Sequence, residues 1–151
     1  MNAEEMLRRL QKPQGCVDMA LDTDAYNEID DQFAIAYALK SPDRMNVKAI
    51  YAAPFFNKKS SGAGDGMRKS YDEILHVLRI AGREDLYPEV YKGSEQFMQD
   101  ERTPVDSPAA RALITLSQNY SAEKPLYVVA IGAITNVASA LLMDPSLADR
   151  I

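Results

Sequence analysis

Five acidic residues fall within the ten positions from Asp22 to Asp31, between an apolar run and a helical pattern. Residues 17–21 predict a buried strand, and residues 30–39 predict a helix. The apolar residues of this helix would share one face, namely Phe33, Ala34, Tyr37 and Ala38. The acidic loop would then lie where a strand ends and a helix begins. In open α/β sheets, ligands bind at that edge.

Carboxylates gathered in one loop repel each other at neutral pH. Water, a raised pKa or a bound cation can relieve the repulsion. Hard divalent cations prefer several oxygen ligands at once, so one interpretation of the loop is a metal site. The other is a solvated loop whose acids favour the N-terminus of the following helix. The acids alone leave both interpretations open.

Composition limits the function further. The chain has 151 residues, of which 46% are hydrophobic, and this suits a single domain with a real core. The net charge of −5 disfavours a protein that binds the backbone of nucleic acids. No stretch approaches the ~20 apolar residues that a membrane span needs.

The N-terminus and the cysteine content indicate a compartment. Residues 1–14 are charged and contain no apolar core, so they do not resemble a signal peptide. The single cysteine, Cys16, excludes an intrachain disulfide, and we expect it to be a small buried hydrophobe at the start of the first strand. A reducing cytoplasm fits best.

Helical and strand patterns alternate along the whole chain. The predicted helices cover residues 4–10, 30–39, 67–81, 107–120 with Asp106 as the cap, and 135–142, with a last helical turn over 146–151. The predicted strands cover residues 17–21, 47–53, 88–93 and 126–131. A glycine-rich stretch, 57–66, is expected to be a mobile loop. This alternation predicts an α/β fold with a mostly parallel, Rossmann-like open sheet flanked by helices.

A second candidate element closes the fourth strand, at residues 131–136. In a parallel sheet, its carboxyl end lies at the same edge as the acidic loop. Gly132 lets the backbone approach a ligand closely, and Thr135 could supply oxygens to a shared site. The alternative is an ordinary strand-to-helix turn in which Thr135 or Asn136 caps the helix.

Together the two elements resemble a known family. Asp22-Thr23-Asp24 followed by Ile29-Asp30-Asp31 is similar to the N-terminal fingerprint of the inosine-uridine preferring nucleoside hydrolases, and residues 130–138 resemble that family's second hallmark turn. The resemblance implies Ca²⁺-dependent hydrolysis of the N-glycosidic bond of ribonucleosides in purine and pyrimidine salvage. It makes Asp24 both the general base and a calcium ligand.

The same resemblance implies roles for five further residues. Asp31 and the carbonyl of Thr135 would bind calcium, Asp30 and Asn57 would contact the substrate, and Asp22 would support the loop. Asn27 lies where this sequence departs from the family pattern, and we expect it to support the loop or, like Tyr26 and Glu28, to reach the ligand. Oxygen ligands from two strand ends suit calcium better than zinc.

The sequence departs from the family pattern in two ways. Ala25-Tyr26-Asn27-Glu28 replaces a Pro-Gly pair, so the acidic loop is two residues longer. The family is also about twice as long as residues 1–151, which leads us to expect the incomplete N-terminal part of a larger domain. We accordingly expect a missing C-terminal half or a homo-oligomer, and little activity from this chain alone.

Two other functions compete with this interpretation. One is a non-catalytic module that binds nucleosides or ribose, or another protein. The other is a phosphatase of the haloacid dehalogenase type, in which Asp22 would be the nucleophile. Neither nucleic acid nor membrane is an expected partner.

Overall fold

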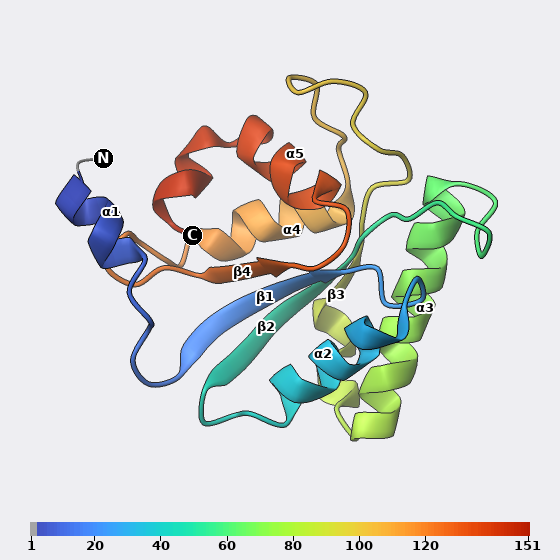
Figure 1. Ribbon diagram of the computed structural model, residues 1–151, viewed down its shortest axis with the longest axis horizontal. Coiled ribbons are helices and arrows are strands. Elements are labelled where there is room, and N and C mark those ends of the chain that lie inside the picture. Colours follow the sequence, from blue (N-terminus) through green and yellow to red (C-terminus); the bar gives the residue numbers. More distant parts are fainter. Residues whose placement is uncertain (1–2) are drawn as a thin grey trace.

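The computed structural model describes residues 3–151, which form one open α/β sheet with helices on both faces (Figure 1). The helices are α1 (Ala3–Arg9), α2 (Ile29–Leu39), α3 (Ala63–Ala81), α4 (Pro108–Ser117) and α5 (Thr135–Met143), with short 3-10 helices η1 (Glu84–Glu89) and η2 (Pro145–Asp149). The strands are β1 (Val17–Thr23), β2 (Met45–Ala52), β3 (Val90–Lys92) and β4 (Tyr127–Ala130). The predicted order, a helix followed by four strand–helix units, is confirmed.

The sheet is parallel throughout and has the order β3-β2-β1-β4. The chain builds outward from β1 through β2 to β3, and then returns to place β4 on the other side of β1. The direction of winding therefore reverses between β1 and β4. Such a reversal opens a crevice at the carboxyl ends of the two strands, because the connections that follow them lead to opposite faces.

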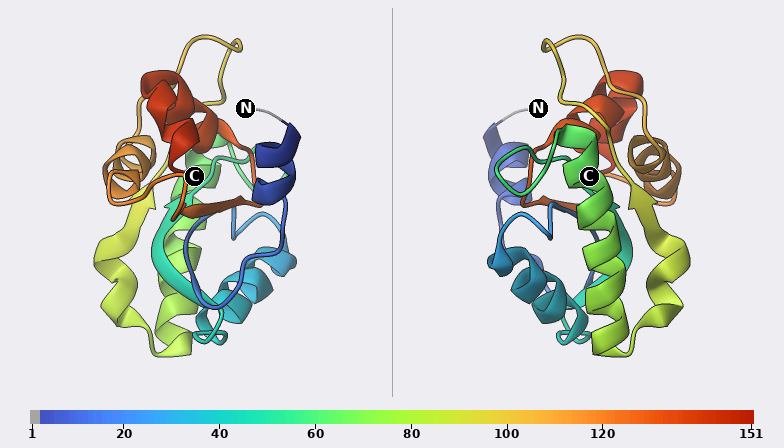
Figure 2. Two further views of the ribbon diagram at one scale, coloured as in Figure 1. Left: turned by 90° about the vertical axis from the view of Figure 1, so that its left-hand side faces the viewer. Right: turned by 90° about the vertical axis from the view of Figure 1, so that its right-hand side faces the viewer.

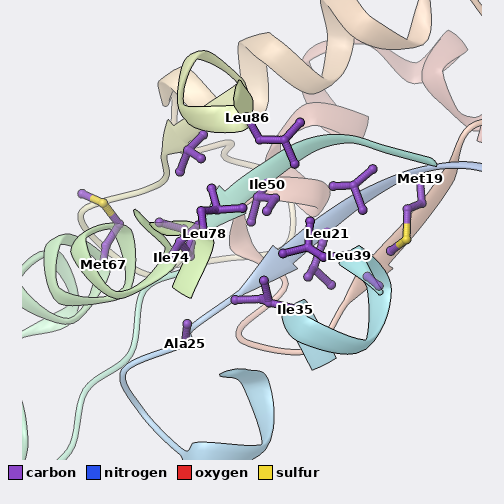
Figure 3. Close-up of a cluster of buried hydrophobic side chains, with 14 residues drawn as sticks. Met19, Leu21, Ala25, Ile35, Leu39, Ile50, Met67, Ile74, Leu78 and Leu86 are labelled. Carbon is purple, nitrogen blue, oxygen red and sulfur yellow. The ribbon is translucent and has the colours of Figure 1, made fainter. Parts of the chain in front are cut away.

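Side chains alternate between the two faces of the sheet along each strand, and they contribute to two separate hydrophobic cores. Leu21 and Ile50 point toward α2 and α3, where they pack with Ile35, Ile74 and other apolar residues (Figure 3). The intervening strand residues point to the opposite face. There α4 and α5 cover them (Figures 1 and 2). Both faces of the two central strands, β1 and β2, are covered, which explains why these strands are largely apolar, whereas Val129 of β4 remains 41% exposed.

The face that α2 turns to the core differs from the predicted one. Phe33 and Tyr37 are 68% and 69% exposed, whereas Ile35 is fully buried. Thr23 Oγ1 donates a hydrogen bond to Asp31 Oδ1 at 2.5 Å, and this fixes the rotation of the first turn. Because Asp31 faces the sheet, the residues four and eight positions later, Ile35 and Leu39, also face the sheet. The larger aromatic residues Phe33 and Tyr37 then face solvent.

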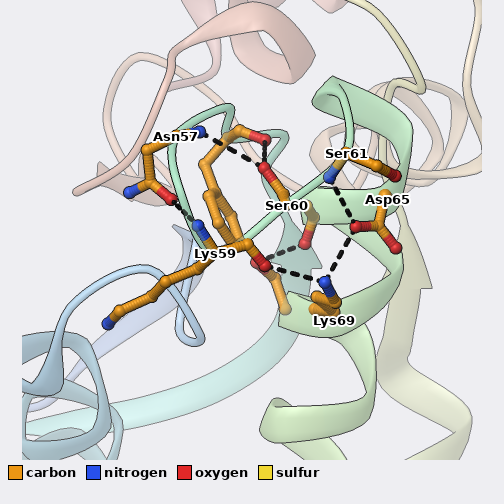
Figure 4. Close-up of polar contacts among 9 residues, drawn as sticks. Asn57, Lys59, Ser60, Ser61, Asp65 and Lys69 are labelled. Atoms are coloured by element: carbon orange, nitrogen blue, oxygen red, sulfur yellow. Dashed lines mark hydrogen bonds and ion pairs between the residues drawn. The ribbon is translucent and has the colours of Figure 1, made fainter.

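The glycine-rich stretch is also more ordered than predicted. Residues 63–66 form the first turn of α3, and hydrogen bonds hold the loop before them (Figure 4). Ser61 N and Lys69 Nζ both donate to Asp65 Oδ2, at 2.9 and 2.8 Å. Lys69 Nζ also donates to the carbonyl of Lys59 at 2.7 Å. The loop is thus tied to the helix that follows it.

Gly66 shows why a glycine is needed inside this helix. A Cβ on Gly66 would lie 2.0 Å from the carbonyl oxygen of Phe55. We expect Gly66→Ala to lower the free energy of unfolding by about 1–3 kcal/mol, since backbone on both sides must move. Urea denaturation measures this, with Gly62→Ala as the control, because nothing lies within 4 Å of a Cβ there. Equal stability of the two variants would contradict the close packing of Gly66 against the backbone of Phe55.

Two smaller expectations are wrong. Cys16 is exposed instead of buried, because it precedes β1 and lies outside both cores. Helix α4 is capped by Ser107, whose Oγ accepts a hydrogen bond from Ala110 N at 3.2 Å. Asp106, the predicted cap, forms an ion pair with Arg111 instead. No helix in residues 3–151 is long and apolar enough to cross a membrane.

Candidate functional site

The acidic loop follows β1 at the carboxyl edge of the sheet, where the direction of winding reverses between β1 and β4. The carbonyl of Asp22 accepts a hydrogen bond from Ile131 N at 2.9 Å, which aligns the end of β1 with the end of β4. A Cβ on Gly132 would lie 3.0 Å from both Cγ and Oδ1 of Asp24. The backbone after β4 therefore lies directly against the Asp24 carboxylate, and the close approach of Gly132 to a ligand stays a prediction.

Asp24 directly follows β1 and is buried at this edge of the sheet. Its Oδ2 accepts a hydrogen bond from Asn27 Nδ2 at 3.0 Å, and its carbonyl accepts one from Asn27 N at 2.7 Å. Burial raises the pKa of Asp24, the Asn27 hydrogen bond opposes the rise, and the charges of Glu28 and Asp30 add to it. Asp24 is thus a positioned carboxylate that binds a proton more readily than an ordinary aspartate.

Asp31 lies in the first turn of α2 and is also buried. Burial raises its pKa to about 6, against the effect of the Thr23 hydrogen bond. The negative charge of Asp24 raises it further, so the two carboxylates lie close enough to repel each other. A cation between them would relieve this repulsion, because an opposite charge favours the ionised form of both groups.

Asp22 points toward the face covered by α4 and α5, and it is 0% exposed. Its Oδ1 accepts a hydrogen bond from Asn136 Nδ2 at 2.8 Å. Within residues 3–151, Asp22 Oδ2 and the neighbouring Tyr51 hydroxyl are buried without a hydrogen-bond partner. Burial raises the pKa of Asp22 to about 7, so the proton is held near neutral pH.

The two residues that were predicted to contact the substrate are exposed at the rim of the acidic loop. Asp30 faces solvent next to Asp31, and Asn57 lies in the loop after β2. Asn57 Nδ2 donates to Asn27 Oδ1 at 2.6 Å, and Lys59 Nζ donates to the carbonyl of Asn27 at 2.6 Å. Asn27 therefore joins Asp24 to the loop after β2. The two additional residues in the acidic loop supply this connection.

Thr135 is the first residue of α5 and is buried, in the turn that contains Gly132. No side chain caps α5 at its N-cap residue, Ile134. The side chain of Asn136 instead reaches across the sheet to Asp22. The sequence gives no signal of this contact, because the two residues are 114 positions apart.

The described residues offer oxygen donors for a metal ion, but their side chains do not form a complete metal site. Within residues 3–151, no group of three or more His, Cys, Asp or Glu side chains is arranged to hold a metal ion. The expected ligand set has only two side-chain carboxylates, Asp24 and Asp31, with the third oxygen from the main chain of Thr135. Oxygen donors of this kind fit a hard cation, whose remaining positions water and substrate can fill.

An open cavity of about 440 Å³ lies beside the acidic loop. Its lining residues come from the loop, from α2 and from the segment after β2, and they are Tyr26, Glu28, Ile29, Gln32 and Lys59. Aromatic, amide and charged groups thus surround a space next to the candidate site.

Comparison with known families adds an independent finding. A family model described as inosine-uridine preferring nucleoside hydrolase matches residues 19–151. The match includes both the acidic loop and the turn after β4. No curated protein matches the chain.

Proposed function

The chain belongs to the inosine-uridine preferring nucleoside hydrolase family, and from this premise we propose that it hydrolyses the N-glycosidic bond of ribonucleosides with Asp24 as the general base. The observation that carries the proposal is the position of Asp24. Its carboxylate lies at the β1/β4 switch point, between the backbone of Gly132 and the amide of Asn27.

Asp24 and its neighbours would perform the chemistry as follows. Asp24 takes a proton from a water molecule, whose oxygen attacks C1′ of the ribose while the bond to the base nitrogen breaks. The base leaves with the bonding electron pair and takes up a proton. Asn27 holds the carboxylate in place, and its hydrogen bond opposes the rise in the pKa of Asp24 and so favours the ionised form that a general base needs.

Calcium is part of the proposal. When bound by Asp24, Asp31 and the carbonyl of Thr135, the ion would make a coordinated water more acidic and hold the ribose hydroxyls. Asp30 at the N-terminus of α2 and Asn57 on the neighbouring loop are exposed and lie within the same rim, where they can contact the ribose.

Burial of Asp22 disfavours the phosphatase alternative. A nucleophilic aspartate must reach the phosphorus atom, whereas the Asp22 side chain is fully buried and bonded to Asn136. The same observation supports a role for Asp22 in supporting the acidic loop from its buried side.

The test is a nucleosidase assay of the chain in its native assembly, since little activity is expected from the chain alone, on a panel of ribonucleosides with calcium or with a chelator. We expect removal of calcium to lower kcat/KM by at least about 100-fold, because an ion at this position stabilises the transition state by several kcal/mol. A phosphomonoester assayed in parallel should not be cleaved. Turnover that is unchanged by the chelator would contradict the calcium proposal, and cleavage of the phosphomonoester alone would contradict the nucleosidase.

A further inference from the structure

Asn136 is the centre of a buried hydrogen-bond network that joins five segments. Its Nδ2 donates to Asp22 Oδ1 at 2.8 Å and to the carbonyl of Ala52 at 3.1 Å. Its Oδ1 accepts from Ser94 N at 2.8 Å, from Ser94 Oγ at 3.0 Å and from Ser107 Oγ at 3.4 Å. The side chain is fully buried, and its donors and acceptor are all used.

The partners of Asn136 lie at the carboxyl edge of the sheet. Asp22 and Ala52 belong to the ends of β1 and β2, and Ser94 follows β3. Asn136 itself is the second residue of α5, and α5 follows β4. One amide thus ties the connection after β4 to the ends of the other three strands.

The space for this amide is closely fitted. A Cβ on Gly93 would lie 2.4 Å from Nδ2 and 2.7 Å from Oδ1 of Asn136, and 2.0 Å from the carbonyl oxygen of Ala52. Glycine at position 93 is therefore required for the amide to reach both the sheet and Ser94. An aspartate in place of Asn136 would fit the same space. It would lose both amide donors and would place a second carboxyl group against Asp22.

We propose that Asn136 is a positioning residue for the proposed reaction: through Asp22 and Ala52 it fixes the turn that contains Gly132 and Thr135 against the acidic loop. The inference rests on the proposed function. Asn136 is buried and does not touch the substrate, so it acts through the residues that it holds. The hydrogen bond from Ile131 N to the carbonyl of Asp22 aligns the two strand ends, and the Asn136 amide adds the side-chain link between the turn with Thr135 and the segment with Asp24.

Asn136→Asp tests the proposal, with Ser139→Ala as the matched control. Ser139 is also a buried residue of α5, and its Oγ accepts a hydrogen bond from Val105 N at 3.0 Å, in the loop before α4. Calorimetry would measure calcium affinity, and steady-state kinetics would measure kcat and KM, at a temperature where near-UV circular dichroism shows each variant folded. We expect Asn136→Asp to weaken calcium binding at least 10-fold and to lower kcat more than it raises KM.

Ser139→Ala should stay within twofold of the wild-type chain in both measurements. Equal losses in the two variants would overturn the proposal, because the role of Asn136 would then be structural only. A folded Asn136→Asp variant within twofold of the wild type would also overturn it. A wild-type chain that neither binds calcium nor hydrolyses nucleosides would instead contradict the proposed function, and the proposal with it.

A measurement on the wild-type chain decides the matter if Asn136→Asp does not fold. Calcium is titrated while the side-chain amide resonance of Asn136 and the backbone amide resonance of Asp24 are followed by NMR. We expect both resonances to shift with the same midpoint. A shift of Asp24 with an unmoved Asn136 resonance would overturn the proposal.

Discussion

Asp24→Ala should lower kcat/KM for ribonucleosides by at least about 1,000-fold, because it removes the general base and one proposed calcium ligand together. The fold should tolerate the change. Burial disfavours the charged form of this carboxyl, so the folded state loses no favourable charge when the carboxyl is removed. The measurement is a comparison of kcat/KM for the purified variant and the wild-type chain, with thermal unfolding as a check on folding.

Asp72→Ala is the matched control for this prediction. Asp72 is exposed on α3, away from the β1/β4 crevice, and its removal changes the net charge by the same amount. We expect its activity to equal that of the wild type. Residual activity above a tenth of the wild type in a folded Asp24→Ala variant would show that another group acts as the base.

Asp22→Asn should stabilise the calcium-free chain in a manner that depends on pH. Burial raises the pKa of Asp22 from 3.8 to about 7, so the folded state holds a proton that the unfolded state releases. This contribution to stability is fully present below pH 3.8 and is lost as the pH rises through 7. At 1.36 kcal/mol for each pH unit, the loss amounts to about 4 kcal/mol.

The asparagine variant carries no titrating group at this position, and its Oδ1 can still accept the hydrogen bond from Asn136. We therefore expect the variant and the wild type to be similarly stable at pH 4, and the variant to be more stable at pH 8 by about 4 kcal/mol. Urea denaturation in a chelator at several pH values measures the difference. Asp43→Asn, at an exposed site, should show no such trend, and parallel curves for Asp22→Asn and the wild type would contradict the buried proton.

The main architecture follows from local patterns. The apolar runs of β1 and β4 are bounded by acidic and glycine-containing segments, so their ends could be predicted, and parallel pairing then places Asp24 and Gly132 together. The positions of the candidate site residues are predictable to the same extent, because Asp24 follows β1 and because Asp31 and Thr135 lie in the first turns of α2 and α5.

The remaining features depend on contacts between distant segments. The rotation of α2 depends on the bond between Thr23 and Asp31, and hydrophobicity alone favours Phe33 and Tyr37 as core residues. Gly66 indicates a loop by its residue type, yet it lies in α3, where the backbone of Phe55 leaves no room for a side chain. The contacts of Asn136 could not be predicted either, because its hydrogen-bond partners come from four other parts of the chain.

The position of β4 has a consequence for how the chain becomes functional during folding. Strands β1 and β2 are close in sequence, whereas Asn136 and Asp22 are separated by 114 residues. Contacts of such separation form late, because the entropy of closing a long loop opposes them. A partly folded chain with β1, β2 and β3 in place would hold the acids in an open loop, without Gly132 or Asn136 behind them. A ligand that needs both halves of the site would therefore bind only chains that have finished folding, and its binding would report that last step.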